Sequence, residues 1–180
     1  MIDRQAIINA FAKTAHPGDD ALCDCDCEDC QWEIARFKNK KWSRLTSSDF
    51  GAEDGGADVS FLTLEGFYYF LPGFLLLLAD NPGNGSLWGQ IVSRLVVSDQ
   101  ASDEKRERVR KLVTRITPAQ RAVLLSVANH SEVATALTTT MFQALVGTLQ
   151  DGRVSPYSLT AVQQEMDTFL RQFRNPRTSM

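Results

Sequence analysis

An apolar run from Phe67 to Ala79, FYYFLPGFLLLLA, constrains the fold of this chain more than any other stretch. A membrane-spanning helix needs about 20 apolar residues, so this shorter run predicts a buried core segment and no insertion into a membrane. Proline disfavours helical angles in the residue before it and fits well in the first turn of a helix. We therefore expect two helical pieces in a buried corner, with a kink at Leu71 and a restart at Pro72.

Apolar residues recur at helical spacing in most of the remaining chain. Local signals mark several helix starts: Thr63 and Ser86 can act as N-caps, and TPAQ, beginning at Thr117, is a capping box with proline at the first helical position. A strand over 90–97 is the alternative for the segment after Ser86. The expected helices cover about 3–14, 30–42, 64–79 in two pieces, 87–97, 103–116, 118–128, 132–149, and 155 or 158 to 173.

These patterns predict a mainly α protein: a single compact helical domain of about six to eight helices over residues 3–173. The tail RNPRTSM, 174–180, is expected to be flexible. The last helix carries its apolar residues on one stripe. The stripe consists of Leu159, Val162, Met166, Phe169, Leu170 and Phe173.

The composition indicates a protein that folds without metal ions or disulfides. With 180 residues and 43% hydrophobic content, the chain can bury a core of its own. Its first residues, MIDRQAIINAFAKTA, form an amphipathic pattern with an acid at Asp3 and lack the basic and apolar regions of a signal peptide. We therefore expect a cytoplasmic protein, in which thiols stay reduced.

All four cysteines lie within eight residues of an acidic stretch, ALCDCDCEDCQWEI. Thiolates bind zinc, but the C-x-C-x-C-x-x-C spacing lacks the distant second pair of a zinc finger. The neighbouring acids attract a dication, yet they also raise thiol pKa values. Because four ligands so close in sequence would strain a tetrahedral site, two thiolates with His16 and a further group is an easier arrangement. The candidate zinc ligands are Cys23, Cys25, Cys27 and Cys30.

Two other interpretations of this stretch remain open. On a helix, Cys27 and Cys30 would belong to a buried face as small apolar residues, and Cys25 would point to the opposite side. Asp26 would then be the N-cap of that helix. A redox-responsive thiol pair is the second interpretation, although the sequence lacks the βαβ pattern and the cationic neighbours that favour such a pair.

Charge is unevenly distributed along this chain, whose formal net charge is −3. Residues 45–100 hold seven acids and one base, whereas 101–180 hold eleven bases and seven acids. In the basic run from Lys105 to Arg115, Glu104 and Glu107 each precede a base by four residues, the spacing of ion pairs on an exposed helix. We therefore expect a solvated helix face and no binding of nucleic acid.

Four separated pieces of the chain form a recognisable series: HPGDD, CEDCQWEIARFKNKKW, SFLTLEGFYYFLPGFLLLLAD and ITPAQRAVL. In this order they resemble an uncharacterised bacterial domain-of-unknown-function family, whose members share a PGDD turn, an acidic segment before an F-x-G-K-x-W-like element, an FLT…LP core motif and a TPxQR helix start. The resemblance covers residues 3–130, and Asn39 stands where we expect glycine. It implies a bacterial α-helical domain and carries over no site residues, because the family has no established activity.

No catalytic constellation stands out in the sequence. The chain has two histidines and no P-loop, H-E-x-x-H, G-x-S-x-G or G-x-G-x-x-G motif. We therefore expect a non-enzymatic interaction protein, most specifically an immunity-type inhibitor that binds and blocks a toxin or another basic partner protein. A metal-binding (zinc) or redox-responsive module is the alternative. The predicted partner-binding acids are Asp49, Glu53, Asp54 and Asp58, with the acidic stretch 19–33 as a second contact edge.

Overall fold

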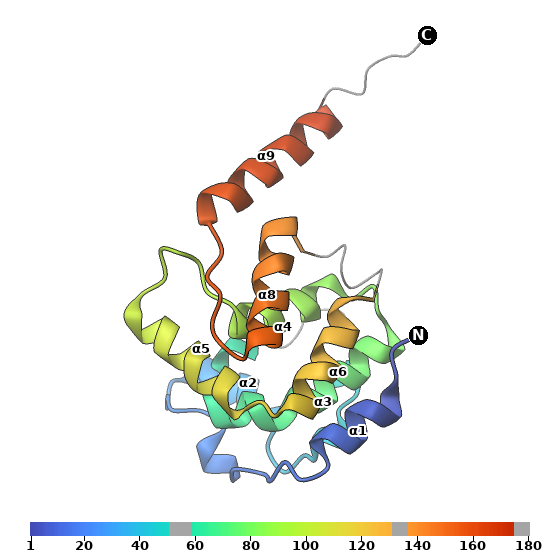
Figure 1. The fold of residues 1–180 in the computed structure, drawn as a ribbon. Coiled ribbons are helices and arrows are strands. Elements are labelled where there is room, and N and C mark those ends of the chain that lie inside the picture. The colour runs from blue at the N-terminus through green and yellow to red at the C-terminus, as the bar shows by residue number, and fades with distance from the viewer. Residues whose placement is uncertain (51–58, 131–136, 175–180) are drawn as a thin grey trace.

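Helices make up the regular structure of the protein in a computed structural model (Figure 1). The structure describes residues 1–50, 59–130 and 137–174, and these contain eight α-helices, four short 3-10 helices and no β-strand. The prediction of a single, mainly helical domain is confirmed. The α-helices are α1 Arg4–Phe11, α2 Glu28–Ala35, α3 Leu64–Asp80, α4 Gly85–Leu95, α5 Asp103–Arg115, α6 Pro118–Ala128, α8 Thr139–Asp151 and α9 Leu159–Arg174. The 3-10 helices are η1 Asp19–Ala21, η2 Trp42–Arg44, η3 Ser47–Phe50 and η4 Val59–Phe61.

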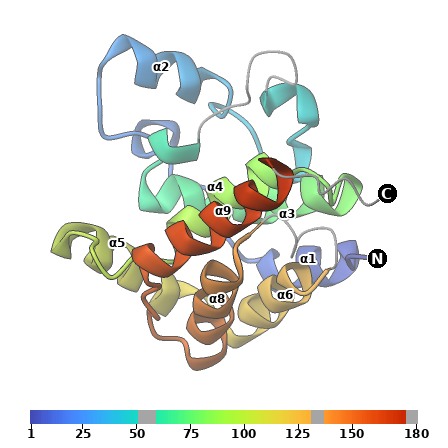
Figure 2. The same ribbon diagram turned by 90° about the horizontal axis from the view of Figure 1, so that it is seen from above.

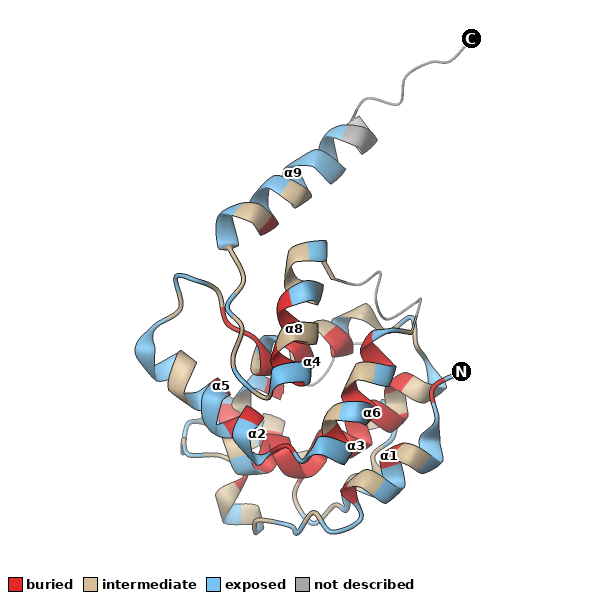
Figure 3. Ribbon diagram, viewed as in Figure 1, coloured by how far each residue is buried: buried red, intermediate tan, exposed pale blue. Residues whose placement is uncertain are grey.

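Helix α3 forms the centre of the core, as Figure 3 shows. Every residue from Gly66 to Leu76 is buried, which confirms the predicted core segment. The predicted break at Pro72 is wrong, because α3 continues through this residue as one helix. An interior proline costs about 3 kcal/mol, and the burial of apolar side chains all around the helix offsets that cost. Within the described residues, no helix combines the length and apolar character needed to cross a membrane.

Gly73 allows a second segment to approach α3 closely. A methyl group built on this glycine would lie 2.5 Å from the carbonyl oxygen of Trp42 in η2 and 2.8 Å from Cδ1 of Leu45. Both distances are too short for non-bonded heavy atoms, so the contact between α3 and η2 requires a residue without a side chain. Trp42 and Leu45 in turn pack against the main hydrophobic core.

Two of the predicted helix starts are confirmed and one is wrong. The Thr63 side chain accepts a hydrogen bond from the first turn of α3, and the capping box at Thr117 is complete. Helix α4 is capped by Asn84 instead of Ser86, because asparagine is an equally good N-cap and an earlier start lengthens the helix. The strand alternative is also wrong, since residues 90–95 are helical.

Helix ends were predicted less well than helix positions. Helix α1 ends at Phe11, before the expected end at residue 14, and α2 ends at Ala35 instead of continuing to residue 42. After α2 the chain turns at Asn39, whose φ of 60° lies in the left-handed region that favours glycine or asparagine. The Asn39 amide donates to the Asp19 carboxylate at 3.0 Å. The start of the helix expected over 132–149 lies outside the described residues.

Helix α9 points away from the rest of the protein in Figure 1, and in Figure 2 it runs in front of α4 with α8 beside it. Val162 is the buried residue of its apolar stripe, and the Glu165 carboxylate accepts a hydrogen bond from the Thr140 amide on α8 at 3.1 Å. Four residues of the stripe are exposed, because the pattern defines an apolar face but not its partner. The Phe173 side chain and residues 175–180 lie outside the described part. The exposed fractions are 42% for Leu159, 49% for Met166, 58% for Phe169 and 46% for Leu170.

Candidate metal centre

Buried side chains hold both ends of the cysteine stretch against α3. Leu22 is fully buried, and its carbonyl oxygen accepts a hydrogen bond from the Thr63 amide at 2.8 Å. Phe37, which follows α2, is also buried, and its ring centroid lies 5.0 Å from that of Phe70. Packing at both ends therefore fixes the position of the segment that carries the four cysteines.

The stretch passes from an irregular segment into helix α2 at Cys27. This residue has extended backbone angles and occupies the N-cap position. The predicted N-cap, Asp26, is thus wrong by one position. Glu28 and Asp29 lie in the first turn as expected, where the helix dipole favours carboxylates.

Three thiol sulfurs meet at the start of α2. The Sγ atoms of Cys25, Cys27 and Cys30 all lie within 4.8 Å of one another, and those of Cys25 and Cys27 are 2.8 Å apart. Cys23 lies outside this group, and its sulfur is 3.4 Å from both the amide nitrogen and the carbonyl oxygen of Cys25. All four cysteines are free thiols. The structure therefore brings together three of the four predicted ligands.

The helical interpretation of the stretch is correct only for its last cysteine. Cys30 is 7% exposed and lies among the buried residues with Ile34 and Phe37, as a small apolar residue would. Cys27 is exposed instead of buried, and Cys25 lies beside it instead of on the opposite side. The rotation of 100° per residue fails here because the residues before α2 are not helical.

Hydrogen bonds hold Cys25 in place next to α2. The Gln31 side-chain amide donates to the Cys25 carbonyl oxygen at 3.1 Å, and Lys38 Nζ donates to Gln31 Oε1 at 3.0 Å. The Cys27 amide donates to the Cys25 sulfur at 3.3 Å. These bonds link the irregular segment to α2 and to the residues that follow this helix. In metal sites, hydrogen bonds of this kind orient the residues that bind the metal.

Hydrogen bonds among the thiols separate their pKa values. The side chains of Cys25 and Cys30, with the Cys30 amide, donate to the Cys27 sulfur and lower the pKa of Cys27, although desolvation and the charge of Asp29 oppose the shift. The bond to Cys27 and then burial raise the pKa of Cys30. The thiolate is the metal-binding form of cysteine, so Cys27 loses its proton before Cys30. A bound metal deprotonates a coordinating thiol outright.

His16 is not part of this group of sulfurs. Its Nδ1 accepts a hydrogen bond from the Gly18 amide at 2.9 Å, and its Nε2 lies 3.6 Å from the Asp19 carboxylate. The ring also meets Tyr69 edge-on, with 4.5 Å between centroids. The arrangement of two thiolates with His16 is therefore not the one that the structure shows.

The predicted partner-binding acids are only partly described by the structure. Glu53, Asp54 and Asp58 lie outside the described residues. The side chain of Asp49 is 14% exposed, forms an ion pair with Lys40 and accepts a hydrogen bond from the Thr46 amide at 2.9 Å. Burial alone would raise the pKa of Asp49, but the bonds to Lys40 and Thr46 outweigh it and lower this pKa. The charge of Asp49 is thus balanced within the chain.

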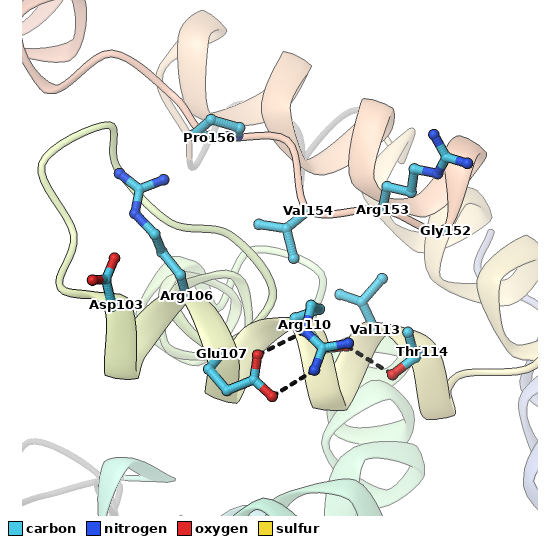
Figure 4. A pocket seen from close by; sticks show the side chains of 10 residues that line it. All are labelled: Asp103, Arg106, Glu107, Arg110, Val113, Thr114, Gly152, Arg153, Val154 and Pro156. Atoms are coloured by element: carbon cyan, nitrogen blue, oxygen red, sulfur yellow. Dashed lines mark hydrogen bonds and ion pairs between the residues drawn. The ribbon is translucent and has the colours of Figure 1, made fainter.

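The basic run on α5 borders an open hollow of about 430 Å³ and carries internal ion pairs (Figure 4). The predicted pair between Glu104 and Arg108 is confirmed, with 2.6 Å between nitrogen and oxygen. Glu107 binds Arg110 through two hydrogen bonds of 2.7 and 2.6 Å, instead of pairing with Lys111 as predicted. These pairs reduce the positive charge that the helix presents. The hollow is lined by Asp103, Arg106, Glu107, Arg110, Val113, Thr114, Gly152, Arg153, Val154 and Pro156.

Comparison with known proteins found no match. No protein-family model, no curated protein and no solved structure matches the chain. The resemblance to a bacterial family of unknown function stays a prediction.

Proposed function

We propose that the protein is a metal-binding module that holds one zinc ion through the thiolates of Cys25, Cys27 and Cys30. The observation that carries this proposal is the convergence of the three sulfurs within 4.8 Å of one another. Thiolates are soft ligands that select zinc over magnesium and calcium, which prefer oxygen. A zinc ion here would connect the irregular segment before α2 to the first turn of that helix.

The spacing of the sulfurs suits a tetrahedral ion. Zinc–sulfur bonds of about 2.3 Å place two sulfurs of a tetrahedral site about 3.8 Å apart. The sulfurs of Cys25 and Cys27 are 2.8 Å apart, and no pair in the group is separated by more than 4.8 Å. Small side-chain rotations would therefore bring all three sulfurs to bonding distance. The exposed position of Cys27 leaves the fourth position to water.

The charges around the sulfurs also favour a dication. Asp24, Asp26, Glu28 and Asp29 are all exposed and surround the cysteines in sequence. Their combined negative potential raises the local concentration of a divalent cation. Metal binding in turn removes the thiol protons that these carboxylates would otherwise help to retain.

The test is metal binding by the purified, reduced protein. We expect about one equivalent of zinc by elemental analysis after removal of unbound metal. Cobalt in place of zinc is expected to give the near-ultraviolet band of thiolate coordination, and magnesium is expected not to compete. Cys30→Ser is expected to lower zinc affinity at least about tenfold, because it removes the ligand fixed in α2.

Cys23→Ser is the matched control for Cys30→Ser. It removes a thiol from the same stretch but not from the group of three, so zinc affinity is expected to change by less than about threefold. Far-ultraviolet circular dichroism of both variants checks that the helices are intact. An absence of zinc from the wild type, or an equal loss of affinity in the two variants, would contradict the proposed ligand set.

A second proposal concerns the partner. We propose that this is a non-enzymatic protein of the reducing cytoplasm that binds a basic partner protein, such as a toxin that it inhibits. The exposure of the acids at 24, 26, 28 and 29 supports this proposal, because such an edge speeds and orients association with a basic surface. Asp49 is a weaker candidate for that surface, since it is already paired with Lys40.

This proposal is tested by affinity capture from the native lysate. We expect a basic protein to bind the wild type stoichiometrically and to dissociate as the salt concentration rises. Neutralising Asp24, Asp26, Glu28 and Asp29 to their amides is expected to slow association at least about tenfold. Unchanged binding after neutralisation would assign the contact to another surface. Zinc content measured on the same variant separates a lost contact from a lost metal.

A further inference from the structure

Cys27 differs from the other cysteines in its exposure and in its close thiol neighbour. It is the exposed member of the four, whereas Cys23 and Cys25 are half-buried and Cys30 is buried. Its sulfur lies 2.8 Å from that of Cys25. We propose that Cys27 is a site of oxidation by hydroperoxides, and that the oxidised sulfur closes a reversible disulfide with Cys25.

Access favours Cys27 as the residue that meets the oxidant. Oxidation of a cysteine requires the peroxide to reach its sulfur, so exposed thiols react before buried ones. Cys27 is the N-cap residue of α2, and it is exposed at this end of the helix. Cys30, only 7% exposed, is fixed in the first turn of the same helix. A peroxide arriving from solvent therefore reaches the Cys27 sulfur first.

The reaction with a hydroperoxide proceeds in two balanced steps. In the first, the Cys27 sulfur attacks one peroxide oxygen: a sulfur–oxygen bond forms, the oxygen–oxygen bond breaks, and the thiol proton leaves with the other oxygen as water or an alcohol. In the second, the Cys25 sulfur displaces hydroxide from this sulfenic acid, and the Cys25 proton leaves with it as water. The two thiols lose two electrons and the peroxide gains them.

Proximity favours Cys25 as the resolving thiol. A disulfide needs the two sulfurs at about 2.05 Å, less than 1 Å closer than they already are. The Cys27 amide donates to the Cys25 sulfur at 3.3 Å, so the chain already turns back between these residues. Residue 25 lies in the irregular segment before α2, where the backbone can adjust without breaking helical hydrogen bonds.

Oxidation would also control the metal site. This consequence rests on the proposed zinc-binding function, because Cys25 and Cys27 are two of its three proposed ligands. Sulfurs joined in a disulfide are no longer thiolates and do not hold zinc. The ion would therefore leave on oxidation and return on reduction.

The test of the oxidation site uses the metal-free full-length protein treated with hydrogen peroxide. Remaining thiols are alkylated under denaturing conditions, and the chain is cut with a protease that cleaves before aspartate. Because Asp24, Asp26 and Asp29 separate the cysteines, each cysteine falls on its own fragment. We expect a product lighter by two hydrogens, with the Cys25 and Cys27 fragments joined. A bond between Cys27 and Cys30, a bond between chains, or earlier oxidation of Cys23 would overturn the assignment.

Two variants test whether Cys27 is oxidised first and Cys25 then reacts with it. In Cys25→Ser the resolving thiol is missing, so sulfenic acid on Cys27 is expected to accumulate and to be trapped by a dimedone reagent. In Cys23→Ser, the matched control, the intramolecular disulfide is expected to form as in the wild type. Sulfenic acid trapped on another cysteine of Cys25→Ser would contradict the role of Cys27.

A second experiment treats the zinc-loaded protein with hydrogen peroxide in the presence of a chelator whose colour change reports free zinc. We expect one zinc released per disulfide formed, and rebinding after addition of a thiol reductant. If the wild type never takes up zinc, the proposed function fails while the metal-free experiment still decides the oxidation site. If the disulfide forms and zinc stays bound, control of the metal by oxidation is overturned.

Discussion

Replacing Gly73 with alanine is expected to destabilise the protein by about 2 kcal/mol, although alanine normally stabilises a helix interior relative to glycine. The reason is the approach of η2 to α3. The new methyl group would lie 2.5 Å from the Trp42 carbonyl oxygen, a backbone atom that cannot rotate away. Either η2 shifts and loses its packing, or α3 moves within the core. Urea unfolding followed by circular dichroism measures the loss in free energy of unfolding.

Gly89→Ala provides the matched control for this prediction. Gly89 also lies inside a helix, α4, but a methyl group built there would meet no other atom within 4 Å apart from its chain neighbours and the nearby backbone of α4. Its replacement is expected to stabilise the protein by about 0.5–1 kcal/mol, the ordinary gain from a better helix former. The two substitutions should therefore shift the urea midpoint in opposite directions. A stabilised Gly73→Ala variant would mean that η2 does not contact α3 as described.

Replacing Phe37 with alanine is expected to cost about 3–5 kcal/mol in free energy of unfolding, the range of large-to-small changes in a packed core. Phe37 is 1% exposed and connects the end of the cysteine stretch to α3. Its ring centroid lies 5.0 Å from that of Phe70 and 6.1 Å from that of Phe74. The substitution removes these ring contacts and leaves a cavity beneath α2. Denaturant unfolding of the variant provides the measurement.

Trp32→Ala tests whether the stability lost in Phe37→Ala comes from the burial of Phe37. The alternative is that any aromatic ring lost near the cysteines has the same effect. Trp32 lies on α2 and is 61% exposed, and its ring centroid lies 4.2 Å from the Arg36 guanidinium carbon. Such an exposed cation–π contact contributes about 0.5–1 kcal/mol, so the expected loss does not exceed about 1 kcal/mol. Similar losses for Phe37→Ala and Trp32→Ala would show that Phe37 does not anchor the stretch to the core.

The fold class could be predicted from sequence because helical spacing and caps are local properties. The box at Thr117 and the cap at Thr63 depend on residues within one turn, and both formed as expected. Pro72 shows the limit of local rules: the preference against proline inside a helix was outweighed by burial around α3. The stripe on α9 shows another limit, because an amphipathic pattern does not reveal which surface will cover it.

The residue types of the candidate site were predictable from the sequence, but the relative positions of their side chains were not. The sequence suggested all four cysteines as candidate zinc ligands, and the structure brings the sulfurs of Cys25, Cys27 and Cys30 together. Helical periodicity misplaced Cys25 and Cys27 because α2 begins only at Glu28. Both cysteines precede the helix and lie in irregular backbone, where no fixed rotation relates their side chains.

The three thiols that converge at α2 lie within six consecutive residues, from Cys25 to Cys30. Bringing together ligands so close along the chain costs little loop-closure entropy, and an unfolded chain would keep them near one another. Zinc would then keep part of its affinity for the unfolded chain, so it would stabilise the folded state by less than its full binding free energy. Gain or loss of the metal could thus change the surface at α2 while the helical core stays folded.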